Sequence, residues 1–118
     1  MFPGVDIIEI ERVAAALARQ PGLAERLFTR RELESLSGRG MQSYAARFAA
    51  KEAVLKAMGT GLRGMSWHDV EIITSQSGEP LVLLSSQAEI QLKERGGSQV
   101  RVSLSHNQTQ AIAFAILS

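Results

Sequence analysis

The sequence predicts an α+β fold in which one long central helix packs on an antiparallel sheet. Residues 43–58 are mostly good helix formers, and Gly59 follows them as a residue suited to the left-handed position past a helix end. Short β-branched or alternating stretches predict strands at 5–10, 68–74, 81–84, 99–105 and 110–117. Strands and helices do not alternate regularly, as they would in a parallel sheet, so α+β is favoured over α/β.

Before the long helix, the sequence predicts one strand and three short helices. Val13 and Leu17 follow helical spacing after the strand at 5–10, and Pro21 with Gly22 ends that helix. Residues 23–28 predict a further helical turn. Thr29 and Glu32 have the spacing of a capping box, which opens a third short helix before a loop at 37–40.

After the long helix, the sequence predicts a hairpin, a helix and a second pair of strands. A turn at 77–80 joins the strands 68–74 and 81–84. Ser86 and Glu89 form a second capping-box pattern, which opens a helix that runs to Arg95. The final strands are joined by residues 106–109.

Length and composition predict a single domain over residues 1–118, because the chain is long enough for one hydrophobic core and too short for two. No apolar run approaches the roughly 18 residues of a membrane span, and the first residues lack the pattern of a secretory signal. The absence of cysteine fits a cytoplasmic location and excludes thiolate ligands. A metal would therefore be held by oxygen or histidine ligands, and the available carboxylates favour magnesium.

The positive charge is concentrated in the first half of the chain. Residues 12–31 hold five arginines and one acid, and residues 39–63 hold five cations and one acid, although the net charge is only +1. This basic half predicts an acidic partner, either a protein or a nucleic acid. Aromatic residues make up only 5% of the chain and do not alternate with the cations, which argues against a base-stacking surface.

Two carboxylates are candidates for chemistry. Glu52 shares a helical stripe with Phe48 and Leu55 and is predicted to face the core, whereas Arg47 and Lys51 lie four apart in another row. Asp6 lies at the start of the first strand, and with Glu52 it makes a pair suited to magnesium. A structural interpretation stays open for both. Glu52 and Lys56 have the spacing of an ordinary ion pair on a helix, and Asp6 has the position of a turn or cap residue.

A glycine loop and a histidine are further candidates. The amides of Gly59, Thr60 and Gly61 could bind phosphate, although the loop lacks the lysine of a P-loop. His106 follows Ser103 and Ser105 at a strand end. It could act as a proton carrier or a phosphate ligand, or it could be a polar turn residue. A serine hydrolase is not favoured, because no G-x-S-x-G elbow surrounds these serines.

Taken together, these motifs resemble a known enzyme family. Residues 4–10 around Asp6, residues 47–53 with Lys56 and the 59–61 loop, and residues 103–106 occur in the order found in the holo-[acyl-carrier-protein] synthases, the small 4′-phosphopantetheinyl transferases. The resemblance covers nearly the whole chain. It implies transfer of the 4′-phosphopantetheine group of coenzyme A to a serine hydroxyl of apo acyl carrier protein, with release of adenosine 3′,5′-bisphosphate, in support of fatty acid biosynthesis.

The resemblance also implies roles for single residues. Asp6 and Glu52 would hold Mg²⁺ on the pyrophosphate, and Lys51 and Lys56 would contact the phosphates. The catalytic set would be Asp6, Glu52 and Lys56, with Glu52 or a metal-bound water as the base. The nucleotide end would be bound by a larger set, namely Arg47, the amides of Gly59, Thr60 and Gly61, and the side chains of Ser105 and His106. Ile8 stands where larger relatives carry a third acid.

The resemblance further implies a homotrimer with each active site between two subunits, and no nucleic-acid or membrane partner. Arg12 and Arg19, on one face of the first helix, would orient the acidic carrier protein. Two alternatives stay open: a non-catalytic basic module that binds acidic protein or nucleic acid, and a nucleotide hydrolase that uses the same metal site.

Overall fold

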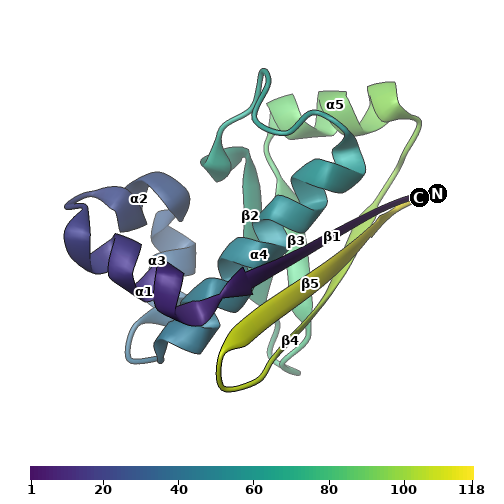
Figure 1. The fold of residues 1–118 in the computed structure, drawn as a ribbon. Coiled ribbons are helices and arrows are strands. Elements are labelled where there is room, and N and C mark those ends of the chain that lie inside the picture. The colour runs from purple at the N-terminus through teal and green to yellow at the C-terminus, as the bar shows by residue number, and fades with distance from the viewer.

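The protein is built around one long helix, α4, in a computed structural model that describes residues 1–118 (Figure 1). In chain order the elements are β1 (Phe2–Glu9), α1 (Ile10–Arg19), α2 (Leu23–Leu27), α3 (Arg30–Leu36), α4 (Met41–Met58), the 3₁₀ turn η1 (Trp67–Asp69), β2 (Val70–Thr74), β3 (Pro80–Leu84), α5 (Ser86–Arg95), β4 (Val100–His106) and β5 (Gln110–Leu117). The predicted α+β class, with a central helix on an antiparallel sheet, is confirmed.

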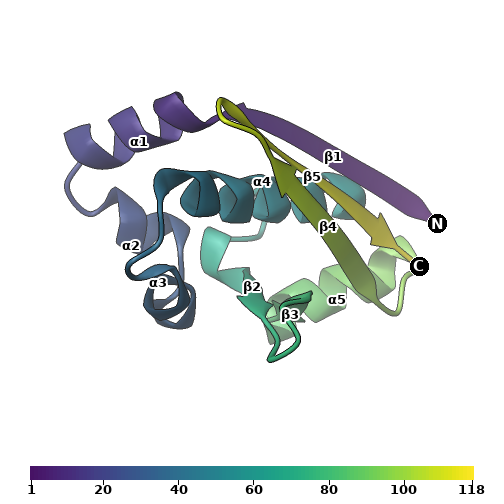
Figure 2. The same cartoon turned by 90° about the horizontal axis from the view of Figure 1, so that it is seen from below.

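Two antiparallel sheets pack against α4, and β3 of the smaller sheet lies next to β4 of the larger one (Figure 2). The larger has the strand order β1-β5-β4, so the last strand of the chain pairs with the first. The smaller is the β2–β3 hairpin. Because apolar neighbours surround α4 on most sides, eleven of its 18 residues are buried, as expected for a core helix rather than a surface helix.

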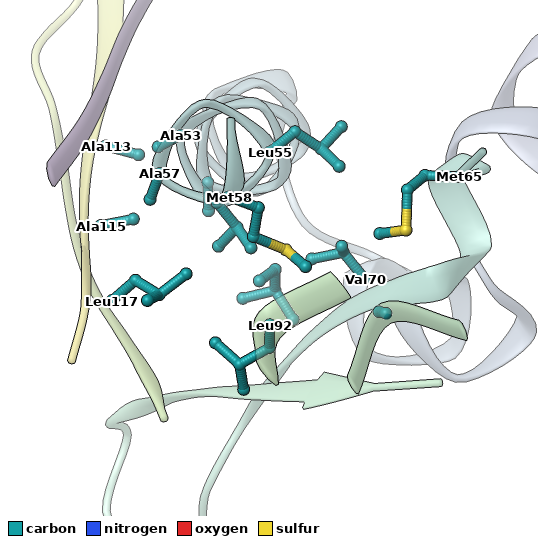
Figure 3. Close-up of a cluster of buried hydrophobic side chains, with 14 of the residues drawn as sticks. Ala53, Leu55, Ala57, Met58, Met65, Val70, Leu92, Ala113, Ala115 and Leu117 are labelled. Atoms are coloured by element: carbon teal, nitrogen blue, oxygen red, sulfur yellow. The ribbon is translucent and has the colours of Figure 1, made fainter. Parts of the chain in front are cut away.

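Small residues let α4 lie close to the larger sheet. Ala53 and Ala57 face Ala113 and Ala115 of β5, and all four are almost fully buried (Figure 3). Gly4 of β1 lies against the same helix, where an added Cβ would come within 2.0 Å of the Ala53 carbonyl oxygen. The backbone of β1 can therefore approach α4 only because position 4 has no side chain.

The opposite side of α4 buries two cations that have partners. The Lys51 ammonium is fully buried and donates to Glu32 Oε1 at 2.6 Å, and Glu32 itself is fully buried. The second Glu32 oxygen accepts from the Ile72 amide at 2.8 Å, and Arg47 Nη1 donates to the Ile72 carbonyl at 2.6 Å. Side chains of α3 and α4 thus satisfy the free edge of β2, which in the hairpin pairs only with β3.

This arrangement corrects the predicted orientation of α4. Glu52 was expected to face the core, with Arg47 and Lys51 in another row, but Glu52 is only half-buried while Lys51 and Arg47 are buried. The physical reason lies in contacts that α4 makes with distant parts of the chain. Glu32 and the Ile72 backbone supply the hydrogen bonds that make burial of two cations tolerable.

Several predicted boundaries also differ by a few residues, and strand β1 runs over Phe2–Glu9 rather than 5–10. Helix α4 begins at Met41, two residues before the predicted start, and His68 belongs to η1 rather than to β2. The box at Thr29 and Glu32 is formed as predicted, with Thr29 Oγ1 accepting from the Glu32 amide. The second box is not formed, because Ser85 and not Ser86 caps α5 by accepting from the Ala88 amide at 3.1 Å.

None of the helices combines the length and the apolar character that crossing a membrane requires.

The buried pair predicts a clear stability effect. Lys51→Met should lower the free energy of unfolding by about 3–5 kcal/mol, because it leaves the Glu32 carboxylate buried without a cation. The double variant Glu32→Gln/Lys51→Met should lose less than the sum of the two single variants, as urea unfolding would measure. Lys93→Met, on the exposed side of α5, is the control and should change little. A Lys51→Met protein as stable as wild type would contradict this account.

Candidate active site

Asp6 and Glu52 meet at the junction of β1, α1 and α4. Alternation along β1 turns Asp6 to the same side as the buried Gly4, toward α4, and Glu52 lies on the half-exposed side of that helix. Both line a cavity of about 440 Å³, together with Arg12 of α1 and eight apolar residues. The structure therefore brings together the two carboxylates that the sequence singled out.

The electrostatics of this cavity are those of a closely spaced acid pair. Partial burial raises the pKa of the Glu52 carboxyl, the negative charge of Asp6 raises it further, and the Lys56 ammonium acts in the opposite direction. Lys56 Nζ lies 3.1 Å from Asp6 Oδ1 and 3.0 Å from the Val5 carbonyl oxygen. The three residues predicted to form the catalytic set thus lie in one cluster.

The donor set of this cluster fits magnesium. Two carboxylates near each other supply hard oxygen ligands, and magnesium commonly takes one or two of these while water and phosphate oxygens complete its shell. No group of three or more acidic, histidine or cysteine side chains is placed so that it could hold a metal ion by itself. A metal here would therefore need further oxygens from a ligand.

Arg47 and His106 line a different cavity. This second cavity, also about 440 Å³, lies among α4, the β2–β3 turn and β4, and it shares no lining residue with the first. Arg47 is held in place by Ser35, the Ile72 carbonyl and Thr74. Burial lowers the pKa of Arg47, and the Glu32 carboxylate opposes that shift. Arg39 and the carboxylate Glu79 also line this cavity, so its two arginines exceed its single acid.

Lys51 does not lie where phosphate contact requires. Its ammonium is fully buried against Glu32, so it can reach a phosphate only by leaving a carboxylate 2.6 Å away. Desolvation lowers the pKa of Lys51, and Glu32 acts in the opposite direction. The expected phosphate contact therefore disagrees with this geometry, and Lys51 is a structural residue here.

The remaining predicted residues lie at separate places on the surface. The Gly59–Thr60–Gly61 loop follows the C-terminal end of α4, and Gly59 lies beside the guanidinium of Arg95. Ser105 is exposed on β4, opposite Ile112 of β5. Arg12 and Arg19 are both exposed on α1, and only Arg12 reaches the first cavity. Within one chain these groups do not form one site.

Sequence reasoning missed two residues of this architecture. Glu32 was identified only as a capping-box acid, yet its carboxylate also binds Lys51 and the Ile72 amide. Arg39 lies in the 37–40 loop as predicted, but its place in the lining of the second cavity beside Arg47 is not indicated by the sequence. The spacing of Thr29 and Glu32 indicated the cap, but no local signal indicated partners 19 and 40 positions away.

Comparison with known proteins gives a consistent result. Residues 3–115 match the model of the 4′-phosphopantetheinyl transferase superfamily. The holo-[acyl-carrier-protein] synthase of Clostridium perfringens strain ATCC 13124 is 46% identical over 120 residues, covering 97% of this chain and 90% of the relative. The synthase of Desulforudis audaxviator is 47% identical over 116 residues, covering 96% of this chain and 88% of the relative.

Solved structures agree with the sequence relatives. The crystal structure of the Neisseria meningitidis synthase superimposes with a TM-score of 0.89 at 31% identity, covering 99% of this chain and 97% of that one. The Helicobacter pylori synthase, solved in complex with coenzyme A, superimposes with a TM-score of 0.87 at 29% identity, covering 98% of this chain and 99% of that one. This chain therefore belongs to the 4′-phosphopantetheinyl transferase superfamily, among the holo-[acyl-carrier-protein] synthases.

Proposed function

We propose that this protein transfers the 4′-phosphopantetheine group of coenzyme A to a serine hydroxyl of apo acyl carrier protein and releases adenosine 3′,5′-bisphosphate. The observation that carries the proposal is the pair of Asp6 and Glu52 in one cavity beside helix α1, with the Lys56 ammonium bound to Asp6. The names of the relatives, and the coenzyme A complex of the Helicobacter pylori synthase, support the same reaction. The link to fatty acid biosynthesis and the cytoplasmic location stay predictions from the sequence.

The reaction requires one bond to form and one to break. The serine oxygen bonds to the phosphorus that carries pantetheine, and the bond from that phosphorus to the bridging oxygen breaks. The bridging oxygen leaves with adenosine 3′,5′-bisphosphate, and the serine proton passes to a base. Glu52 is the proposed base, because its carboxylate lines the cavity that would receive the serine.

Asp6 and Glu52 would hold magnesium on the pyrophosphate. When bound, the ion neutralises charge on the phosphates and on the leaving group. Lys56 extends from α4 with a side chain that is 53% exposed, so its ammonium can turn from Asp6 to a phosphate without an added burial cost. Arg47 and Arg39 provide positive charge, and His106 a ring nitrogen, in the second cavity, which is proposed to bind the nucleotide end with the 3′-phosphate as ligand.

The carrier protein is proposed to dock on α1. Arg12 and Arg19 present positive charge on this helix, and acidic surfaces are steered to such charge. Next to Arg12, the first cavity is lined by Leu17, Leu23 and Phe48, which can receive an apolar side chain of the carrier. A carrier docked here would bring its serine to the mouth that holds Asp6 and Glu52.

The active site is proposed to form between subunits of a homotrimer. In one chain the carboxylate cluster and the cavity of Arg47 and His106 share no residue, so neither is a complete coenzyme A site. The outer face of the larger sheet also exposes an apolar patch, made of four side chains that are 42–58% exposed: Val5, Ile7, Ile112 and Phe114. They form two cross-strand pairs directly opposite each other on β1 and β5. Another copy of this chain is the proposed occupant, because β1 carries Asp6 on its other face, beside the incomplete site.

The reaction is tested by the intact mass of apo acyl carrier protein after incubation with this protein, coenzyme A and magnesium. We expect a gain of one phosphopantetheine group, and its loss on addition of a chelator. Glu52→Gln should lower the rate about 100-fold or more, because it removes one ligand and the proposed base. Glu89→Gln on exposed α5 should leave the rate unchanged. No mass gain with several carriers would favour the non-catalytic binding module, and coenzyme A cleavage without a carrier would favour the hydrolase.

The trimer is tested by light scattering after size-exclusion chromatography. Phe114→Arg should convert the trimer to a monomer and abolish transfer, because it places a charge in the apolar patch. Ile90→Arg, at a similarly exposed apolar residue on α5, should leave the mass and the rate unchanged. An active Phe114→Arg monomer would contradict a site shared between subunits.

Carrier docking is tested at Arg19, which lies outside the first cavity. Arg19→Glu should raise the KM for the carrier about tenfold and leave the KM for coenzyme A unchanged, because reversing the charge weakens electrostatic steering. The effect should shrink at high salt. Arg63→Glu, exposed in the loop after α4, is the matched control. A change in the KM for coenzyme A alone would place Arg19 at the nucleotide instead.

A further inference from the structure

The position of Lys56 has a consequence beyond phosphate contact. Lys56 lies one helical turn after Glu52 and reaches across to β1, where its ammonium donates to Asp6 Oδ1 at 3.1 Å and to the Val5 carbonyl at 3.0 Å. Asp6 is well shielded, with 16% of its side chain exposed, whereas 53% of the Lys56 side chain is exposed. The ammonium therefore occupies a position next to the oxygen that a metal ion would use.

The charges around this cavity already balance. Asp6 and Glu52 provide two negative charges, while Arg12, which lines the same cavity, and Lys56 provide two positive ones. A divalent ion that entered alone would face two nearby cations and would give the cluster a formal charge of +2. A pyrophosphate that entered with the ion would supply compensating negative charge and a new partner for the ammonium.

We propose that Lys56 is an exchangeable counter-ion, which neutralises Asp6 in the free protein and moves to the pyrophosphate when the metal and coenzyme A bind together. This inference rests on the proposed function. In the free protein, Lys56 competes with the metal for Asp6. Once phosphate is present, Lys56 binds the phosphate and leaves Asp6 to the metal, so the metal and coenzyme A bind cooperatively. By linkage, each raises the affinity for the other by the same factor.

The counter-ion role and a simple phosphate-ligand role predict different effects of removing Lys56 on the metal affinity of the free protein. A lysine that only binds phosphate contributes nothing to metal affinity in the free protein, so its removal would leave that affinity unchanged. A counter-ion on Asp6 opposes the metal, so its removal raises metal affinity in the free protein. Lys56→Gln removes the charge while keeping a polar side chain on an exposed stem.

The experiment is a titration of the whole protein with Mn²⁺, which replaces Mg²⁺ as a spectroscopic probe, followed by the electron paramagnetic resonance signal of free Mn²⁺. It is done without ligand and with saturating coenzyme A, in the absence of carrier. Without coenzyme A, Lys56→Gln should bind Mn²⁺ about tenfold more tightly than wild type. Coenzyme A should tighten Mn²⁺ binding strongly in wild type and about tenfold less in Lys56→Gln. Lys56→Arg should behave as wild type, because it keeps the charge.

Three controls make the outcomes distinct. Lys93→Gln, at the remaining lysine, should match wild type, and Asp6→Asn should abolish tight Mn²⁺ binding. Thermal melting confirms that each variant is folded. A Lys56→Gln protein with unchanged or weaker Mn²⁺ affinity in the absence of coenzyme A would overturn the counter-ion role, while carrier modification by wild type would still uphold the proposed function. Absence of Mn²⁺ binding by wild type even with coenzyme A would overturn both.

Discussion

The close contact between helix α4 and strand β1 is the constraint on which the rest of the molecule depends. Gly4 lies against the Ala53 backbone, and alanines line both the helix and the neighbouring strand β5. Because no large side chain separates the two layers, a short aspartate on β1 and a glutamate on α4 line the same cavity. A fold with bulky residues at this contact would hold the same carboxylates further apart.

The helix uses its other side in a different way. There it buries Lys51 and Arg47, which bind Glu32 and the free edge of β2. Buried cations of this kind are costly unless every donor has a partner, and no buried side-chain nitrogen or oxygen in the chain lacks one. This network joins α3, α4 and the hairpin, and it fixes the position of Arg47 at the wall of the second cavity. Arg47 therefore both stabilises the fold and lines the cavity that is proposed to bind the nucleotide.

The separation of the two cavities supports the proposal that a single copy of this chain does not form a complete transferase site. The carboxylate cluster lies on the β1 side of α4, and the cationic cavity lies on the hairpin side, with the helix between them. A coenzyme A molecule that uses both kinds of group needs them on the same surface. Association through the exposed apolar face of β1 and β5 would bring groups of neighbouring copies together, and it would cover the apolar area as well. Under the proposed exchange of Lys56, the balanced charges around Asp6 would make the site competent only when metal and phosphate bind together.

Local sequence patterns were enough to predict the class of fold, the order of nearly every element and the two carboxylates that share the first cavity. These features are local or short in range: helix formers that end at Gly59, alternating strands, a capping box at Thr29, and motifs in a familiar order. Tertiary structure decided which charges are buried. Helical spacing placed Glu52 inward because it lies between Phe48 and Leu55, but Lys51 is the buried residue, because Glu32, 19 positions earlier, provides its partner. Helical spacing shows which residues share one face of a helix. Whether a charged residue on that face can be buried depends on a partner from a distant part of the chain, which spacing does not reveal.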